Sequence, residues 1–344
     1  MPLAASTRSV RCLSVKEMPR ATQPDQAFAI QDNEQYQPAR TMGDQHVRVR
    51  GRAGAGLLLC HASRSLDMPH RGVERLFVIV HGALRDSDRY LGHASAAAEQ
   101  VSSRTLIVAP QFLADVDIRA HPSAPDDALY WDVEGWKGGE HALGPASLSS
   151  FAAMDSLLRR LTGPGRLPPA RKLEVVIMGS SAGGQYVNRY AAVGRAPDAL
   201  ADRGTHVRFI IANPSTYLYF DGERPVQVPD GSCVNHWRYG FDAAPAYVTS
   251  GPRRSLERYL SRDVTIVLGN DDTDRATLLL EVSPAAMAQG ATRLERGRYY
   301  DEHVRRLARA AGLAAGHQLI QLTGVGHDAK EILAAPQTRR VLFG

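Results

Sequence analysis

Cysteine is scarce in this chain of 344 residues, and the motifs of several common site types are missing. The three cysteines, Cys12, Cys60 and Cys233, are odd in number and far apart, and they form no Cys-x-x-Cys pair. The sequence therefore predicts neither a zinc site nor a disulfide framework. It also contains no His-Glu-x-x-His and no Gly-x-x-x-x-Gly-Lys-Ser/Thr motif, and the glycine-rich stretch 51–56 follows no continuous buried strand. We accordingly expect no metal and no cofactor.

Long apolar runs and clustered basic residues are also missing. No apolar run approaches the length of a transmembrane helix, and the N-terminal residues contain basic side chains but no continuous apolar stretch typical of a secretory signal. We therefore expect a cytoplasmic protein with no membrane span. The formal net charge is +5, but the arginines are interspersed with acidic residues, which argues against nucleic acid as a partner.

The distribution of apolar residues predicts one large α/β domain. Residues 1–45 are poor in apolar periodicity, so we interpret them as a poorly ordered N-terminal arm. Further on, buried runs alternate with helical segments, which is typical of a mostly parallel sheet with helices on both faces. We predict a single domain over 46–344, with cap-like loops at about 113–145 and 214–254. Strands are predicted at 46–50, 56–61, 75–80, 105–109, 173–178, 207–212, 264–268 and 318–322.

The most informative motif is Gly-x-Ser-x-Gly at 179–183, which is centred on Ser181. An apolar strand precedes it and a segment with helical character follows it. Small residues on both sides permit a sharp turn that exposes the serine hydroxyl above the sheet edge, close to the first N–H groups of the helix. A glycine-rich stretch can also be a plain turn, but this context favours a nucleophile elbow. Of the two adjacent serines, only Ser181 is centred between the glycines.

A nucleophilic serine needs a histidine that accepts its proton and a carboxylate that orients the histidine. In the elbow architecture the partners follow the serine in the order acid, then histidine. His327 comes after two closely spaced glycines at the end of the last predicted strand, so we predict that it is the base.

Three aspartates follow the predicted strand 264–268 and compete for the role of the acid. We prefer Asp272, because the residues before it give the chain room to turn off the strand; Asp271 comes second and Asp274 third. The alternative is a solvated or calcium-like acidic turn, which would lack the further ligands of an EF-hand loop.

The turn after strand 75–80 supplies a candidate oxyanion hole. In this architecture that turn donates one backbone N–H to the oxyanion, and the residue after the nucleophile donates another. The expected donors are the N–H groups of Ala83 and Ala182. His81 lies upstream of the nucleophile, so we expect it to support this loop rather than act as the base. Arg85 could recognise an acidic substrate, but tying down its own loop is the favoured role.

Together these motifs resemble those of the α/β-hydrolase family, in the family's order: His81-Gly82, the elbow at 179–183, the acidic turn at 269–272 and Gly326-His327. The resemblance extends over residues 46–344 and implies an α/β-hydrolase fold. Within the family, the chain is similar to a microbial group with His-Gly-x-x-Arg, Ser-Ala-Gly-Gly-Gln and Asn-Pro-Ser motifs. Its elbow also looks like that of polyhydroxyalkanoate depolymerases and feruloyl-type esterases. It departs from many relatives at Ser180, where they carry a histidine.

Aromatic residues are frequent in the two predicted cap loops. If these loops cover the sheet edge, their rings would wall a substrate pocket that holds an acyl chain, an aryl ester or a polymer unit. The rings could equally pack the loops onto the domain, and the sequence does not separate the two interpretations. The candidate pocket residues are Trp131, Trp136, Tyr217 and Tyr219.

These observations lead to a hypothesis of function. We predict a carboxylesterase-like serine hydrolase that acts on a small-molecule or oligomeric ester through an acyl-enzyme on Ser181. An amidase or acyltransferase with the same triad remains an alternative. A catalytically inactive binding module with the hydrolase fold is the other, and the complete set of triad candidates argues against it.

Overall fold

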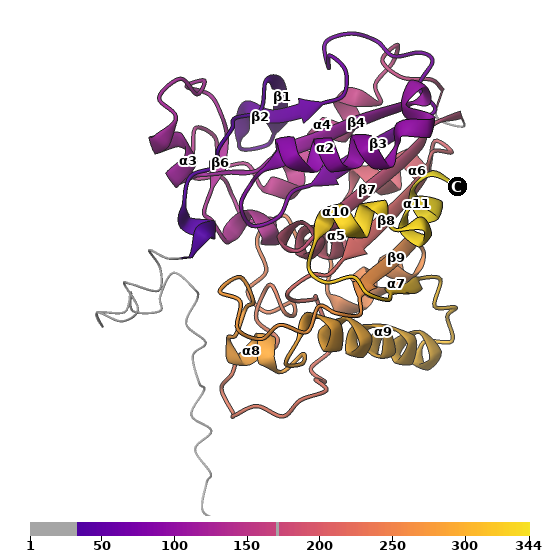
Figure 1. The fold of residues 1–344 in the computed structure, drawn as a ribbon. Helices are drawn as coiled ribbons and strands as arrows, with labels where there is room; N and C mark the ends of the chain where they lie inside the picture. The colour runs from indigo at the N-terminus through magenta and orange to yellow at the C-terminus, as the bar shows by residue number, and fades with distance from the viewer. Residues whose placement is uncertain (1–32, 170–171) are drawn as a thin grey trace, which may run out of the picture.

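The computed structural model describes residues 33–169 and 172–344, which are built around one eight-stranded sheet (Figure 1). The strand order is β1-β2-β4-β3-β7-β8-β9-β10. The pairs β1–β2 and β2–β4 are antiparallel, and every other neighbouring pair is parallel. The strands are β1 (Gln45–Gly51), β2 (Gly54–Ala62), β3 (Arg75–Val80), β4 (Thr105–Gln111), β7 (Glu174–Ser180), β8 (His206–Ala212), β9 (Asp263–Gly269) and β10 (Gln318–Leu322).

Helices cover both faces of the sheet, because alternate side chains of each central strand are apolar and point to opposite sides. In β3, Leu76 and Val78 face one core cluster, whereas Phe77 and Ile79 face the other. The first cluster lies under α4 (Ser150–Leu161), α5 (Ala182–Val193), α7 (Pro252–Leu260) and α9 (Arg293–Ala310). The second lies under α2 (Ser87–Ala97), α10 (Ala329–Ala334) and α11 (Pro336–Phe343) (Figure 1). The predicted mostly parallel sheet between two helical layers is confirmed.

The predicted strands all exist. The helix between β3 and β4 is α2, which begins at Ser87 and ends at Ala97, and a short 3-10 helix, η2 (Glu99–Arg104), follows it. The buried positions of α2 are Ser87, Tyr90, Ala94 and Ala97. Small and polar residues of this kind give a weak apolar stripe, so the sequence pattern hides the start of the helix.

Residues 33–44 pack against the domain, although the sequence placed them in a poorly ordered arm. They include a 3-10 helix, η1 (Glu34–Tyr36), and the buried Ala39, whose N–H donates to Asp117 over 2.7 Å. These contacts run through backbone groups, so apolar periodicity does not report them. Residues 1–32 of the predicted arm lie outside the described residues.

The two predicted cap loops follow β4 and β8, whose carboxyl ends share one edge of the sheet because these strands run parallel. The first loop contains four short elements: β5 (Leu113–Ala114), α3 (Asp115–Ala120), β6 (Tyr130–Trp131) and η3 (Gly135–Gly138). The second has no helix or strand between β8 and α7. Two further short helices are α6 (Ala196–Ala201) and α8 (Pro284–Met287).

Two of the three cysteines, Cys60 and Cys233, lie among the described residues. Cys60 is a buried free thiol, whereas Cys233 is disulfide-bonded, which the cysteine spacing did not indicate.

Within residues 33–169 and 172–344, none of the helices combines the length and apolar character that crossing a membrane requires.

Candidate active site

The predicted elbow is a sharp turn between β7 and α5. Ser181 sits in this turn with φ 58° and ψ −120°, a backbone conformation that is unfavourable for a residue with a side chain. A Cβ atom on Gly179 would lie 2.2 Å from the carbonyl oxygen of Gly183, and one on Gly183 would lie 2.3 Å from that of Val80. Both contacts are too close, so the turn requires glycine at these two positions. The Ser181 N–H donates to the Ala212 carbonyl over 3.0 Å, which anchors the turn to β8.

The structure brings the three predicted triad side chains together in one chain of hydrogen bonds. The distance from Ser181 Oγ to His327 Nε2 is 2.9 Å, and that from His327 Nδ1 to Asp272 Oδ2 is 2.7 Å. The Asp272 side chain is 1% exposed and that of His327 is 26% exposed. The two competing aspartates, Asp271 and Asp274, are exposed instead. A buried carboxylate thus faces a histidine that solvent can reach.

Arg293, at the start of α9, holds the carboxylate of Asp272 from the other side. Its Nη1 lies 3.4 Å from Asp272 Oδ1, and its Nε donates to Ser215 Oγ over 3.1 Å. The Leu294 N–H donates to the Asp272 carbonyl over 3.3 Å. Burial lowers the pKa of Arg293, and the charge of Asp272 opposes this shift. No sequence signal pointed to Arg293, because helix starts with an arginine are common and the contact spans 21 residues.

Asn213, directly after β8, links the acidic turn to the histidine loop. Its Oδ1 accepts the Gly269 N–H over 2.9 Å, and its Nδ2 donates to the Gly326 carbonyl over 3.0 Å. A Cβ atom on Gly269 would lie 2.4 Å from the Val325 carbonyl oxygen, so the two segments touch there. These contacts fix the loops that carry Asp272 and His327 relative to each other.

Hydrogen bonds within residues 81–85 fix the loop of the predicted oxyanion donor Ala83. The Gly82 carbonyl accepts from His81 Nδ1 over 2.8 Å and from the Arg85 N–H over 3.3 Å. In a trans peptide the N–H points away from the carbonyl, so the Ala83 N–H faces the opposite side. Among the described residues, the Ala83 and Ala182 N–H groups donate no hydrogen bond to another backbone group. Their role as oxyanion donors stays a prediction.

The buried ion pair between Arg85 and Asp117 fastens this loop to the N-terminal segment. Arg85 Nε and Nη2 donate to Asp117 Oδ2 and Oδ1 over 2.6 and 3.1 Å. The remaining guanidinium bonds go to the carbonyls of Ala83, Gln35 and Gln37 over 2.9, 2.8 and 2.6 Å. Both charged side chains are fully buried. A guanidinium so completely bonded has no capacity left for a substrate, in agreement with the favoured loop role.

His81 also supports the loop from within the core. Its Nδ1 donates to the Gly82 carbonyl, and its Nε2 accepts the Phe112 N–H over 2.9 Å, which fixes the tautomer. The ring lies 4.7 Å from that of Trp136, centroid to centroid. Burial lowers the pKa of His81 to about 4, so the ring is neutral at pH 7.

This pKa leads to a prediction about acid stability. An unfolded histidine titrates near pH 6.5, so between pH 6.5 and 4 the unfolded chain binds a proton that folded His81 does not. The stability that His81 contributes is therefore complete above pH 6.5 and is lost as the pH falls towards 4. We expect His81→Gln to lower the unfolding free energy at pH 7 by about 2 kcal/mol and to flatten its decline below pH 6.5. Urea denaturation over this pH range measures both effects, and an unchanged slope would contradict the prediction.

The four aromatic residues proposed from the sequence as pocket walls lie elsewhere. Trp131, Trp136 and Tyr217 have no exposed surface, and Tyr219 is 1% exposed. Trp136 stacks on Phe112, and Tyr217 and Tyr219 both contact the ring of Tyr300 in α9. Side chains buried in this way offer no surface to a substrate; they pack the loops onto the domain, which was the second interpretation.

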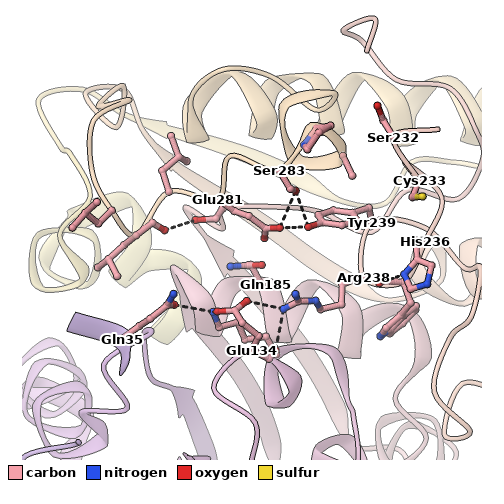
Figure 2. A pocket seen from close by; sticks show the side chains of 18 of the residues that line it. Gln35, Glu134, Gln185, Ser232, Cys233, His236, Arg238, Tyr239, Glu281 and Ser283 are labelled. Atoms are coloured by element: carbon pink, nitrogen blue, oxygen red, sulfur yellow. Dashed lines mark hydrogen bonds and ion pairs between the residues drawn. The ribbon is translucent and has the colours of Figure 1, made fainter. Parts of the chain in front are cut away.

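A cavity of about 560 Å³ reaches α5, the helix that follows Ser181, and has other walls. Its nearest lining residue on α5 is Gln185, one helical turn after Ser181, which corresponds to a rise of about 6 Å along the helix. Neither Ser181 nor His327 lines it. Figure 2 shows Glu134 and Arg238 on one side, Glu281 and Tyr239 on the other, and Gln185 between them. The apolar and aromatic surface comes from Tyr36, Trp237, Pro284, Ala285 and the leucines at 278–280.

No protein-family model matches the chain, and the comparison with curated proteins found no match. Solved structures do match. A poly(3-hydroxybutyrate) depolymerase from Bordetella parapertussis is 23% identical, with a TM-score of 0.62 over 88% of this chain and 91% of that one. Poly(aspartic acid) hydrolase-1 from Sphingomonas sp. KT-1 is 22% identical, with a TM-score of 0.60 over 90% of this chain and 100% of that one. The chain has the α/β-hydrolase fold. The resemblance that the sequence motifs indicated is thereby confirmed at the level of the fold.

In the α/β-hydrolase fold, side chains after the carboxyl ends of parallel strands meet at one sheet edge. Ser181, Asp272 and His327 follow β7, β9 and β10 respectively. Groups of three or more potential metal-ligating side chains are not found within the described part of the chain.

Proposed function

We propose that this protein is a serine hydrolase that cleaves carboxylic ester bonds through an acyl-enzyme on Ser181. The observation that carries the proposal is the hydrogen-bond chain from Ser181 Oγ through His327 to the buried carboxylate of Asp272. A serine placed in a strained turn, with a histidine and an acid in line behind it, is the arrangement that activates a hydroxyl for attack.

In the first half of the proposed reaction, Ser181 Oγ attacks the ester carbonyl carbon while His327 Nε2 accepts the hydroxyl proton. Asp272 accepts the Nδ1–H hydrogen bond, keeps the lone pair on Nε2 available and stabilises the imidazolium that forms. The negative charge on the carbonyl oxygen is held by the N–H groups of Ala83 and Ala182, with support from the N-terminus of α5.

The second half releases the products. The bond between the carbonyl carbon and the alcohol oxygen breaks, and His327 donates its proton to the departing alkoxide. Water then attacks the acyl-enzyme with His327 again as the base, which yields the carboxylic acid and regenerates the Ser181 hydroxyl. The depolymerase is named for a polyester, which supports the inclusion of oligomeric esters in the proposal, whereas the poly(aspartic acid) hydrolase is named for a polyamide.

A fluorophosphonate probe tests this proposal, because it phosphonylates only a serine that a neighbouring base activates. We expect stoichiometric labelling of the wild type and no labelling of Ser181→Ala. Ser180→Ala is the matched control, since it removes the adjacent hydroxyl, and it should retain labelling. The readout is intact-protein mass spectrometry on samples whose folding is verified by circular dichroism. Folded wild-type protein that resists the probe would overturn the proposed function.

A further inference from the structure

We infer that the cavity beside Ser181 contains a carboxylate-binding subsite centred on Arg238, so that the preferred ester carries a second, free carboxylate group. This inference rests on the proposed function and names the class of substrate for the same site.

The evidence begins with the hydrogen bonds that Arg238 makes. Its Nη1 donates to the Glu134 carbonyl over 3.0 Å and to Glu134 Oε2 over 2.8 Å. No residue in the described part of the chain accepts a hydrogen bond from its Nε or Nη2, although the side chain is only 7% exposed. Both nitrogens retain some accessible surface, because neither belongs to the fully buried atoms that lack a hydrogen-bond partner. Arg238 also lines the cavity. The Nε–Nη2 edge of the guanidinium is therefore presented to the cavity.

That edge has the geometry that a carboxylate recognises. Its parallel N–H groups match the two carboxylate oxygens and form a bidentate pair. Arg85 uses the same Nε and Nη2 atoms to hold the two oxygens of Asp117 in the core of this protein. Arg238 presents the corresponding edge without a partner carboxylate from the described residues, which leaves that position to a ligand.

Gln185 adds a second donor to the same surface. Its Oε1 accepts from Thr216 Oγ1 over 2.8 Å and from Arg189 Nη1 and Nη2 over 3.4 and 3.3 Å. These contacts fix the orientation of the amide, so Nε2 points the other way. Nε2 has no acceptor among the described residues, and Gln185 lines the cavity between the two walls (Figure 2). Open donors on Arg238 and Gln185 thus face a common space.

The charges around the cavity also favour an anion at this point. Burial disfavours the charged form of Glu134, but Lys137 and Arg238 outweigh it and hold the pKa of this carboxyl at about 2. Its single negative charge is therefore shared between two cations. Behind the wall, burial lowers the pKa of Arg189 to about 9, which leaves it charged at pH 7. On this wall the cavity is lined by two cations, Lys137 and Arg238, and one acid, Glu134. Burial opposes the charge of Arg238, but the charges of Glu134, Glu281 and Glu140 raise its pKa and so keep it protonated.

The opposite wall carries one acid, Glu281, and one of its two carboxylate oxygens already accepts two hydrogen bonds. Glu281 Oε1 accepts from the hydroxyl of Tyr239 and, over 3.1 Å, from that of Ser283. Leucines 278–280 and Trp237 supply apolar surface to the same cavity. A ligand that fits this surface has a short methylene segment and ends in a carboxylate that is directed at Arg238, away from Glu281.

Two matched pairs of esters test the inference. The first pair is the mono-p-nitrophenyl ester of adipic acid and p-nitrophenyl hexanoate, which differ by a carboxylate in place of a terminal methyl group on the acyl side. The second pair, followed by pH-stat titration, is the acetate ester of 6-hydroxyhexanoate and hexyl acetate, which places the carboxylate on the alcohol side. We expect kcat/KM to be about 10- to 100-fold higher for the carboxylated member of at least one pair.

The variants separate the subsite from a general loss of structure. Arg238→Met should remove most of the preference by raising KM for the carboxylated ester, and Arg238→Lys should restore only part of it, because lysine lacks the fork. Glu281→Gln keeps an acceptor oxygen for Tyr239 and Ser283 but removes the negative charge, so it should raise kcat/KM for the same ester by about threefold. Arg262→Met is the matched control: Arg262 is also 7% exposed and lies outside the cavity.

The outcomes separate the inference from the proposed function. If p-nitrophenyl hexanoate is hydrolysed and the fluorophosphonate probe labels Ser181, but neither carboxylated ester is preferred, the subsite is refuted while the hydrolase proposal stands. A preference that survives in folded Arg238→Met refutes the assignment of the subsite to Arg238. If Arg238→Met fails to fold, Glu281→Gln decides, because a fall in kcat/KM for the preferred carboxylated ester would contradict the inference. If no ester is turned over and no labelling occurs, the failure is that of the proposed function.

Discussion

Replacing either Ser181 or His327 with alanine should lower kcat for a short p-nitrophenyl ester by about a million-fold, and combining the two changes should cost little more. The reason is that the two side chains act as one unit: the hydroxyl is a weak nucleophile unless Nε2, at 2.9 Å, accepts its proton. Any remaining turnover would come from substrate binding and the oxyanion donors, which both variants retain.

Steady-state kinetics on highly purified protein measures this effect, and thermal melting shows whether each variant remains folded. The backbone conformation at position 181 is equally unfavourable for serine and for alanine, so Ser181→Ala should change the melting temperature little. The control is Ser180→Ala, which should lose less than about tenfold in kcat because it removes at most one hydrogen bond. Substantial turnover by folded Ser181→Ala would identify another nucleophile and refute the proposed mechanism.

Asp272→Asn should lower kcat by about 10,000-fold, the second largest effect that we expect. An asparagine amide in place of the carboxylate no longer stabilises the imidazolium, and it can hold His327 in the wrong tautomer. The matched change Asp271→Asn affects an exposed neighbour without a contact to His327, so it should alter kcat by less than about threefold.

The comparison between the two aspartate variants decides which acid belongs to the triad. Because Arg293 lies 3.4 Å from Asp272 Oδ1, the Asn variant also replaces a buried ion pair with a neutral contact. Thermal melting therefore has to accompany the kinetics, since an unpaired buried cation is costly. Equal losses of kcat in folded Asp271→Asn and Asp272→Asn would show that neither aspartate alone orients the histidine.

The fold and the triad candidates were predictable because their signals are local in the sequence. Each parallel strand is a short apolar run, and the nucleophile, acid and histidine candidates follow three of these runs at the sheet edge. The glycines around Ser181 were informative for a physical reason: a Cβ atom on Gly179 or Gly183 would meet backbone atoms. Local sequence therefore specified the backbone of the elbow.

The support around the triad was not predictable, because it depends on side chains that meet only in the folded chain. Arg293 contacts Asp272 across 21 residues, and Asp117 holds Arg85 across 32. Arg85 belongs to the His-Gly-x-x-Arg motif, which indicated its loop role but not its partner Asp117. Arg293 belongs to no pattern that separates it from the many other arginines in the sequence. The aromatic residues did not mark the pocket for a related reason. The sequence indicates that Trp136 lies in a loop, but not that its ring faces the core.

The N-terminal segment joins the cavity wall through a contact that is less stable than the central sheet. Asn33 donates to the Leu278 carbonyl across 245 residues, and Tyr36 and Leu278 both line the cavity, so the N-terminal segment closes one part of the cavity wall. Such a long-range, partly exposed contact opens at a lower free energy than the sheet itself. We therefore expect hydrogen exchange to be faster in this part of the cavity wall than in β7 and β9, the strands that precede Ser181 and Asp272.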